Sequence, residues 1–167
     1  ITTYKQYDVA DNDTDATPPV DFNTNQEWSH GTHTAGLATA DINNGIGIAS
    51  LGANVELIGV KCTPNSAPNA GSIWYSYQGV QWACQNGANV VSMSFGGTTS
   101  SAAFQSLINA YPEVVFLAAA GNNGVTTLNY PGAYNNVICV GSVDGNDAKS
   151  SFSNYNGTTP YVDIASP

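Results

Sequence analysis

The sequence is poor in basic residues: among 167 residues it has only three, Lys5, Lys61 and Lys149, against 12 acidic residues. Nucleic-acid binding depends on Lys and Arg side chains that neutralise phosphates, so a formal net charge of −9 argues against a nucleic-acid partner. Long hydrophobic runs are also missing, since no stretch reaches the roughly 18 apolar residues that a membrane-spanning helix needs. The first residues lack a basic stretch followed by an apolar one, so they predict no signal peptide.

Cysteines are few as well, and their number is odd. Cys62, Cys84 and Cys139 form neither a C-x-x-C pair nor a Cys/His metal-binding spacing, so at most one intrachain disulfide can form. Cys139 lies in the apolar run 137–140 and is expected to be a buried thiol. We predict a disulfide between Cys62 and Cys84. Reduced thiols remain the open alternative, because the sequence does not show whether the two side chains have the geometry that a disulfide requires.

Half of the acidic residues lie near the beginning of the chain, at Asp8, Asp11, Asp13, Asp15, Asp21 and Glu27. Thr, Pro and Asn crowd the same region, a composition typical of a solvated loop. A cation site is the alternative interpretation of these carboxylates. We expect residues 1–27 to be an acidic loop region and residues 28–167 to be the core of one domain, since the length suits a single unit.

From residue 55 onward, short apolar runs alternate with helical patterns. The apolar runs predict strands at 55–61, 90–95, 113–120 and 137–143, and the intervening patterns predict helices around 73–84 and 101–110. Strands that are apolar on both faces and separated by helices are typical of a parallel sheet covered on both sides. The sequence therefore predicts an α/β fold.

Two of the predicted strands end in glycine-rich segments, Ser-Met-Ser-Phe-Gly-Gly at 92–97 and Ala-Ala-Ala-Gly-Asn-Asn-Gly at 118–124. Parallel sheets place ligands beyond the carboxyl ends of their strands, and small residues there allow a peptide to approach the backbone. Ordinary strand-terminating turns are the alternative for either segment alone.

The strongest local feature is Trp-Ser-His-Gly-Thr-His-Thr-Ala-Gly at 28–36, with Ser29 as the expected N-cap of a helix running to about Ala40. Gly31 and Gly36 would each cost roughly 1 kcal/mol inside a helix, so close packing or room for a substrate is expected to require them. Zinc is not indicated, because a zincin helix needs His-Glu-x-x-His. We interpret His33 as structural and His30 as the histidine that can face a cleft.

The segment His-Gly-Thr-His-Thr-Ala-Gly resembles the histidine motif of the subtilisin-like serine proteases, the subtilase family. Further segments resemble that family in order along the chain: 43–48, 79–83, 92–97, 119–122, 129–132, 137–143, 151–153 and 162–167. The resemblance covers about residues 28–167. It implies a three-layer fold with a mostly parallel sheet flanked by helices, incomplete in this chain, and a cis bond between Tyr130 and Pro131.

The same resemblance implies roles for particular residues in a serine endopeptidase with a Ser-His-Asp triad. His30 would be the general base and Asn122 would donate its side-chain amide to the oxyanion. Extended substrate would pair with the strand residues Ser94, Phe95 and Gly96. The pocket for the side chain before the scissile bond would be lined by Ala119, Ala120 and Gly121.

Two parts of the family pattern do not occur in these residues. The nucleophile stands in a Gly-Thr-Ser-Met-Ala type motif, which the sequence lacks, and Asp13-Thr14-Asp15 matches the aspartate motif poorly because no apolar run precedes it and no glycine follows it. We therefore expect this chain alone to be inactive, with the remaining parts of the same protease as its partner and polypeptides as substrates. A catalytically inactive homologue that binds peptides is the alternative.

Calcium and secretion follow from the resemblance alone. No cofactor is expected for catalysis, but a structural calcium ion could be held by Asp41, Asn43 and Asn44, for which a plain Asn-Gly turn is the alternative. The acidic surface and the tolerance for a disulfide agree with an extracellular location.

Overall fold

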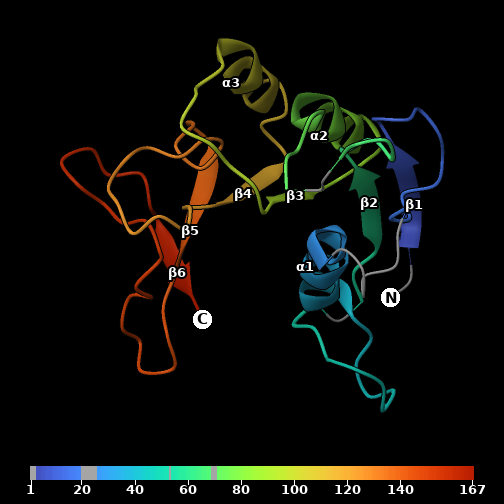
Figure 1. The fold of residues 1–167 in the computed structure, drawn as a ribbon, viewed down its shortest axis with the longest axis horizontal. Coiled ribbons are helices and arrows are strands. Elements are labelled where there is room, and N and C mark those ends of the chain that lie inside the picture. Colours follow the sequence, from blue (N-terminus) through green and yellow to red (C-terminus); the bar gives the residue numbers. More distant parts are fainter. Residues whose placement is uncertain (1–2, 20–25, 53, 69–70) are drawn as a thin grey trace. The chain divides into compact units, whose positions relative to one another are not determined.

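The computed structural model describes residues 3–19, 26–52, 54–68 and 71–167. They form two compact units, Ile1–Asn86 and Gly87–Pro167, which are described in turn (Figure 1). The single domain predicted over 1–167 stays a prediction. The longest described helices have ten residues, so none of them could cross a membrane.

The first unit contains a pair of parallel strands, β1 (Thr3–Asp8) and β2 (Leu57–Lys61), with Thr3 opposite Leu57 and Asp8 opposite Lys61. The short helix η1 (Gln26–Ser29) and α1 (His30–Thr39) connect the two strands, and α2 (Ser76–Gln85) follows β2. β1 corrects the expectation of a loop over 1–27. Its Thr and Tyr residues favour extended backbone, and pairing with β2 satisfies its peptide groups.

Helix α1 (His30–Thr39) has the predicted extent, with Ser29 at its N-cap position. Ser29 has helical backbone angles of −79° and −17° and its side chain makes no capping hydrogen bond, because η1 runs directly into α1. A Cβ added at Gly31 would meet nothing within 4 Å, and one at Gly36 would meet only Ile48 Cδ1 at 3.5 Å. Close packing therefore does not explain Gly31, and room for a substrate stays a prediction.

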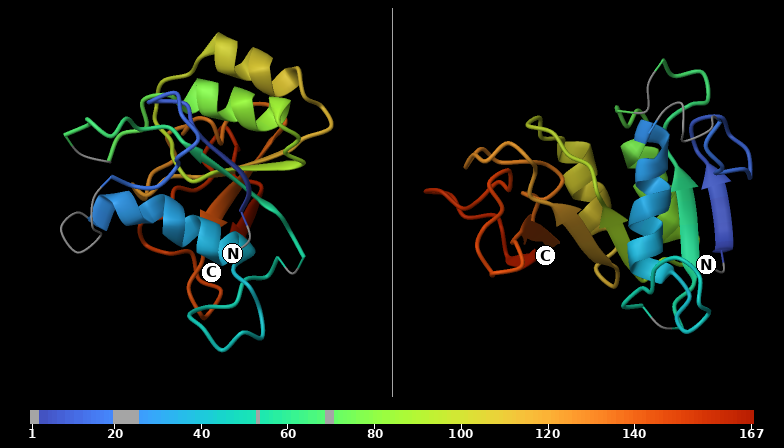
Figure 2. Two further views of the ribbon diagram at one scale, coloured as in Figure 1. Left: turned by 90° about the vertical axis from the view of Figure 1, so that its right-hand side faces the viewer. Right: turned by 60° about the horizontal axis from the view of Figure 1, so that its bottom comes forward.

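The second unit is built on a parallel sheet with the strand order β3-β4-β5-β6 (Figure 2). Its elements are β3 (Val90–Met93), α3 (Ala102–Asn109), β4 (Val115–Ala119), β5 (Val137–Ser142) and β6 (Ile164–Ser166). Ser101 caps α3, since its Oγ accepts a hydrogen bond from Phe104 N at 3.3 Å. The predicted α/β class is confirmed.

The two faces of this sheet differ in burial. Side chains on one face are almost fully buried, among them Met93, Phe116 and Cys139, as expected for Cys139. The register places four partly exposed apolar residues on the opposite face: Val90, Val115, Ile138 and Ile164. A complete three-layer fold covers its sheet on both sides, and the exposed face agrees with the expectation that the fold is incomplete in this chain.

The expected Cys62–Cys84 disulfide is not formed in the structure, because Cys62, Cys84 and Cys139 all carry reduced thiols. A Cβ added at Gly79 of α2 would overlap Cys62 Sγ, which shows that this thiol packs against the helix at Gly79. Cys84 lies five residues further along the helix. Five residues turn an α-helix by about 140° beyond one full circle, so Cys84 projects from a different side than the one facing Cys62.

Candidate active site

The second unit has a hollow at the carboxyl ends of its strands, with a volume of about 330 Å³. Five of the predicted site residues line it: Ser94, Ala119, Ala120, Gly121 and Asn122. Phe95 and Gly96 continue the chain directly after Ser94. The structure thus brings the two glycine-rich strand ends together where a parallel sheet ordinarily holds its ligand.

Asn122 itself is exposed and stands in a loop held by a buried residue, Asn154. The backbone N–H of Asn154 donates to Gly121 O at 2.9 Å, and its side-chain Oδ1 accepts from Asn123 N at 2.9 Å and Val125 N at 3.3 Å. Gly121 has a φ of +104°, a conformation that L side chains rarely adopt. Sequence reasoning missed Asn154, which lies 31 positions beyond Asn123 and follows a segment that had been matched to the family.

A second asparagine connects the two strand ends. Asn129 is buried and donates from Nδ2 to Ala119 O at 3.2 Å, while a Cβ added at Gly96 would overlap its side-chain amide. Next to it, Gly97 and Tyr130 exchange two backbone hydrogen bonds of 2.8 and 2.7 Å. The bond between Tyr130 and Pro131 is cis, as expected. The segment expected to bind substrate is therefore fixed to the turn that follows the loop 121–125.

Tyr161 is hydrogen-bonded to the backbone on both sides of the same loop. Its hydroxyl lies 3.0 Å from Ala120 O and 3.1 Å from Thr127 O, and its proton can be donated to either carbonyl. Burial raises the pKa of Tyr161, and a hydrogen bond with Asn154 partly opposes that rise. Because the pKa of its hydroxyl is raised, Tyr161 remains a neutral hydrogen-bond donor at physiological pH. Its ring packs with Ala120 and Cys139 in a buried cluster.

His30 and His33 lie in the first turn of α1, and both side chains are exposed. The interpretation of His33 as a structural histidine is not supported by burial. His30 belongs to the first unit and Asn122 to the second. That the two act in one site stays a prediction.

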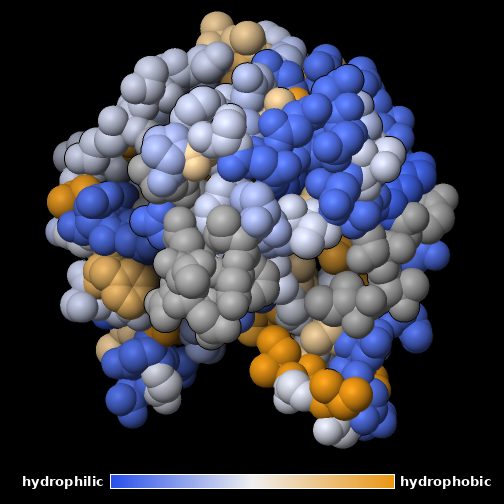
Figure 3. Space-filling model, turned by 45° about the vertical axis from the view of Figure 1, so that its right-hand side comes forward, coloured by the Kyte–Doolittle hydropathy of each residue, from blue (hydrophilic) through white to orange (hydrophobic). Residues whose placement is uncertain are grey.

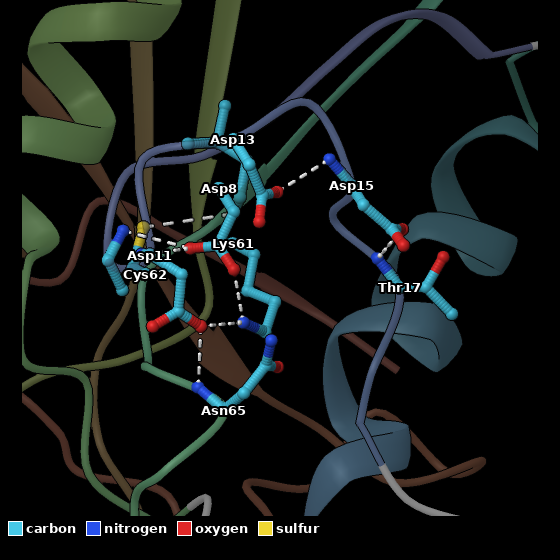
Figure 4. A network of polar contacts seen from close by, with 10 residues as sticks. Asp8, Asp11, Asp13, Asp15, Thr17, Lys61, Cys62 and Asn65 are labelled. Atoms are coloured by element: carbon cyan, nitrogen blue, oxygen red, sulfur yellow. Dashed lines mark hydrogen bonds and ion pairs between the residues drawn. The ribbon is translucent and has the colours of Figure 1, made fainter.

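The acidic residues after β1 lie in a loop in which Asp11, Asp13 and Asp15 are exposed, as the solvated-loop interpretation expects, and their carboxylates form a hydrogen-bonded network (Figure 4). Asp8 is fully buried, forms an ion pair with Lys61 and accepts from Ala10 N at 2.9 Å and Asp11 N at 3.0 Å. Asp11 Oδ2 accepts from Asn65 N at 2.7 Å, and this bond lowers the pKa of Asp11 most strongly. The carboxylates thus satisfy backbone donors of a tight turn.

Further along this turn, Asp13 Oδ1 accepts from Asp15 N at 2.8 Å, and Asp15 Oδ1 accepts from Thr17 N at 2.9 Å. Hydrogen bonds from Thr17 lower the pKa of Asp15. Asp13 therefore serves the turn, which agrees with its poor match to a catalytic aspartate motif. Asp21, the fifth acidic residue of the region, lies outside the described residues.

The expected calcium donors lie in an exposed loop after α1. Asn44 Oδ1 already accepts from Ile46 N at 2.9 Å, which is the turn expected as the alternative. Asp41 and Asn43 are both exposed. As a separate feature, the space-filling view in Figure 3 shows hydrophobic residues at the lower margin of the face drawn there. Calcium takes six to eight oxygen ligands. Within the described ranges no group of three His, Cys, Asp or Glu residues surrounds a metal position, and a calcium ion at Asp41, Asn43 and Asn44 stays a prediction.

Similar proteins are found by both sequence and structure. Thermitase of Thermoactinomyces vulgaris is 42% identical over 140 residues, which cover 83% of this chain and 48% of thermitase. A thermophilic serine proteinase of Bacillus sp. (strain AK1) is 38% identical over 165 residues, which cover 98% of this chain and 38% of that protein. The chain therefore spans half or less of the length of these relatives.

Among solved structures, a psychrophilic subtilisin-like protease from the Antarctic psychrotroph Pseudoalteromonas sp. AS-11 matches with a TM-score of 0.69 and 34% identity, covering 83% of this chain and 31% of that one. A cold adapted subtilisin-like serine proteinase matches with a TM-score of 0.72 and 27% identity, over 99% of this chain and 55% of that one. A profile of the subtilase family matches residues 2–167. The fold is subtilisin-like, and the chain belongs to the subtilase family.

Proposed function

We propose that this chain is part of a serine endopeptidase and supplies its general base, one oxyanion donor and the strand that pairs with substrate. The observation that carries the proposal is the hollow at the strand ends, where Asn122 lies together with Ser94 and the small residues Ala119 and Gly121. Small walls leave space for a side chain of the substrate, and an exposed amide at the rim can reach a peptide carbonyl.

In this proposal each residue has a defined task. Ser94, Phe95 and Gly96 pair with the backbone of an extended polypeptide, which fixes the scissile bond beside Asn122. The imidazole of His30 removes the proton from the hydroxyl of the attacking serine and returns it to the leaving amine. Asn122 Nδ2 donates to the oxygen that becomes negative in the tetrahedral intermediate.

The serine and the aspartate of the triad come from the remaining parts of the protease, because neither motif occurs in these 167 residues. Alone, the chain has a base but no attacking atom and is expected to be inactive. Secretion is proposed on the resemblance. If a structural calcium ion is held near Asp41, a chelator should lower the melting temperature of the complete protein, and an unchanged temperature would remove calcium from the proposal.

The direct test is labelling with a fluorophosphonate, which reacts with activated serines. The protein translated from the complete reading frame should be labelled, while the 167-residue chain and a His30→Ala variant of the complete protein should not. Absence of label on a folded complete protein that still binds an extended peptide would favour the alternative, a catalytically inactive peptide-binding homologue.

A further inference from the structure

Asn154 is a buried residue that is hydrogen-bonded to the loop 121–125 on both sides of Asn122. It is only 3% exposed and lies in the segment that follows Ser153, far from the 122 region in sequence. Three of its hydrogen bonds go to Gly121 O, Asn123 N and Val125 N. The residues immediately before and after Asn122 are therefore both bonded to the same partner.

The rest of the loop is joined to the same segment. Gly124 N donates to Phe152 O at 2.7 Å, and Tyr155 N donates to Val125 O at 3.1 Å. A Cβ added at Gly121 would lie 2.6 Å from Asn154 Nδ2, so the backbone approaches this amide as closely as glycine allows. These contacts leave the backbone at Asn122 little freedom to shift.

We propose that Asn154 is a positioning residue that holds the amide of Asn122 where the oxyanion forms. The inference rests on the proposed role of Asn122. An oxyanion donor stabilises the transition state only if it is in place before charge develops, because reorganising it would cost part of the gain. Asn154 fixes the backbone on both sides of Asn122 and thereby holds the Asn122 amide in place before the reaction. It touches neither the substrate nor the reacting atoms.

The kinetic test is a double-mutant cycle in the complete protein. Asn122→Ala should lower kcat by about 100- to 1000-fold, a magnitude established on a subtilisin. Asn154→Ala should lower kcat by about 10-fold with little change in KM, because misplacing a catalytic group weakens but does not abolish its contribution. With Asn122 already replaced, Asn154→Ala should have no further effect, since a residue that acts through Asn122 loses its influence when that amide is absent.

Each kinetic outcome has a separate meaning. Equal losses from Asn154→Ala in both backgrounds would overturn the positioning role and leave the function of Asn122 intact, as would an unchanged kcat in Asn154→Ala. An unchanged kcat in Asn122→Ala, or a complete protein without activity, would overturn the proposed function and this inference together. Ile108→Val, a buried α3 substitution remote from the loop, is the control for destabilisation and should leave kcat unchanged.

A structural readout remains informative if Asn154→Ala folds poorly. Amide hydrogen exchange at Asn123 and Val125 should be slow in the wild type and in Asn154→Asp, whose carboxylate can accept the same two hydrogen bonds. It should be at least about 10-fold faster in Asn154→Ala, whereas exchange at Phe116 in β4 should change little. Equal protection at Asn123 in all three proteins would overturn the inference.

Discussion

The carboxylate of Asp8, at the end of β1, forms an ion pair with the ammonium group of Lys61 at the end of β2, and both side chains are buried. Lys61 also lies 3.4 Å from the Asp11 carboxylate and 5.7 Å from the centre of the Trp28 ring. A charge in this position is stable only while its partner is present, because desolvation penalises each ion separately.

Lys61→Met should therefore lower the free energy of unfolding by about 3 to 5 kcal/mol, since it leaves the Asp8 charge buried without its partner. The double variant Asp8→Asn, Lys61→Met should recover part of that loss, because it removes both charges. Urea denaturation of the wild type, the single variants Asp8→Asn and Lys61→Met, and the double variant measures the difference. A double variant that is as unstable as the sum of the single variants would show that the pair is not coupled.

Acid should weaken the turn after β1. The hydrogen bond from Asn65 lowers the pKa of Asp11 below its usual 3.8, so this group stabilises the folded state above that value and loses the contribution as pH falls through its folded pKa. Stability should therefore decline below about pH 4, and Asp11→Asn should decline less steeply. Thermal unfolding between pH 5 and pH 2 measures this difference, and parallel profiles would contradict it.

Local patterns in the sequence predicted most of the elements. The alternation of apolar runs with helical patterns located β2, β3, β4, β5 and the helices α2 and α3, because periodicity reflects which side chains are buried. β1 was missed because its polar residues lack an apolar run. Its pairing with β2, about 50 positions away, is a long-range contact that a local pattern cannot contain.

The candidate site was predictable to a similar degree. Residues at the strand ends carried recognisable motifs, and the structure places Ser94 and Asn122 around one hollow. The supporting contacts of Asn129, Asn154 and Tyr161 were not predicted, because ordinary polar residues acquire this role only through contacts made in the fold. The capping hydrogen bond expected from Ser29 is absent for a related reason, since η1 ends at Ser29 and runs directly into α1.

The thiols should be inert in the folded protein. Burial raises the pKa of Cys62 to about 12 and that of Cys139 to about 11, so neither forms a reactive thiolate near neutral pH. Neither should react with iodoacetamide at pH 8. After denaturation without a reductant, all three cysteines should be titrated. A count of one thiol would instead show that Cys62 and Cys84 pair.

The two histidines of α1 should differ in their contribution to catalysis. His30→Ala in the complete protein should lower kcat by on the order of 10⁴-fold, because it removes the base that activates the serine. His33→Ala is the matched control on the same helix and should retain activity within about 10-fold. Peptide hydrolysis and fluorophosphonate labelling measure both variants. A larger loss from His33→Ala than from His30→Ala would reverse the assignment.

Gly79→Ala should destabilise the first unit, because the added methyl group would overlap Cys62 Sγ. Overpacking of this kind costs about 1 to 3 kcal/mol. Cys62→Ala removes the sulfur atom, so the double variant should be more stable than Gly79→Ala alone. Gly31→Ala, another helical glycine but with nothing within 4 Å, is the matched control and should stabilise the protein by roughly 0.5 to 1 kcal/mol. Equal effects of the two glycine replacements on urea unfolding would contradict close packing at Gly79.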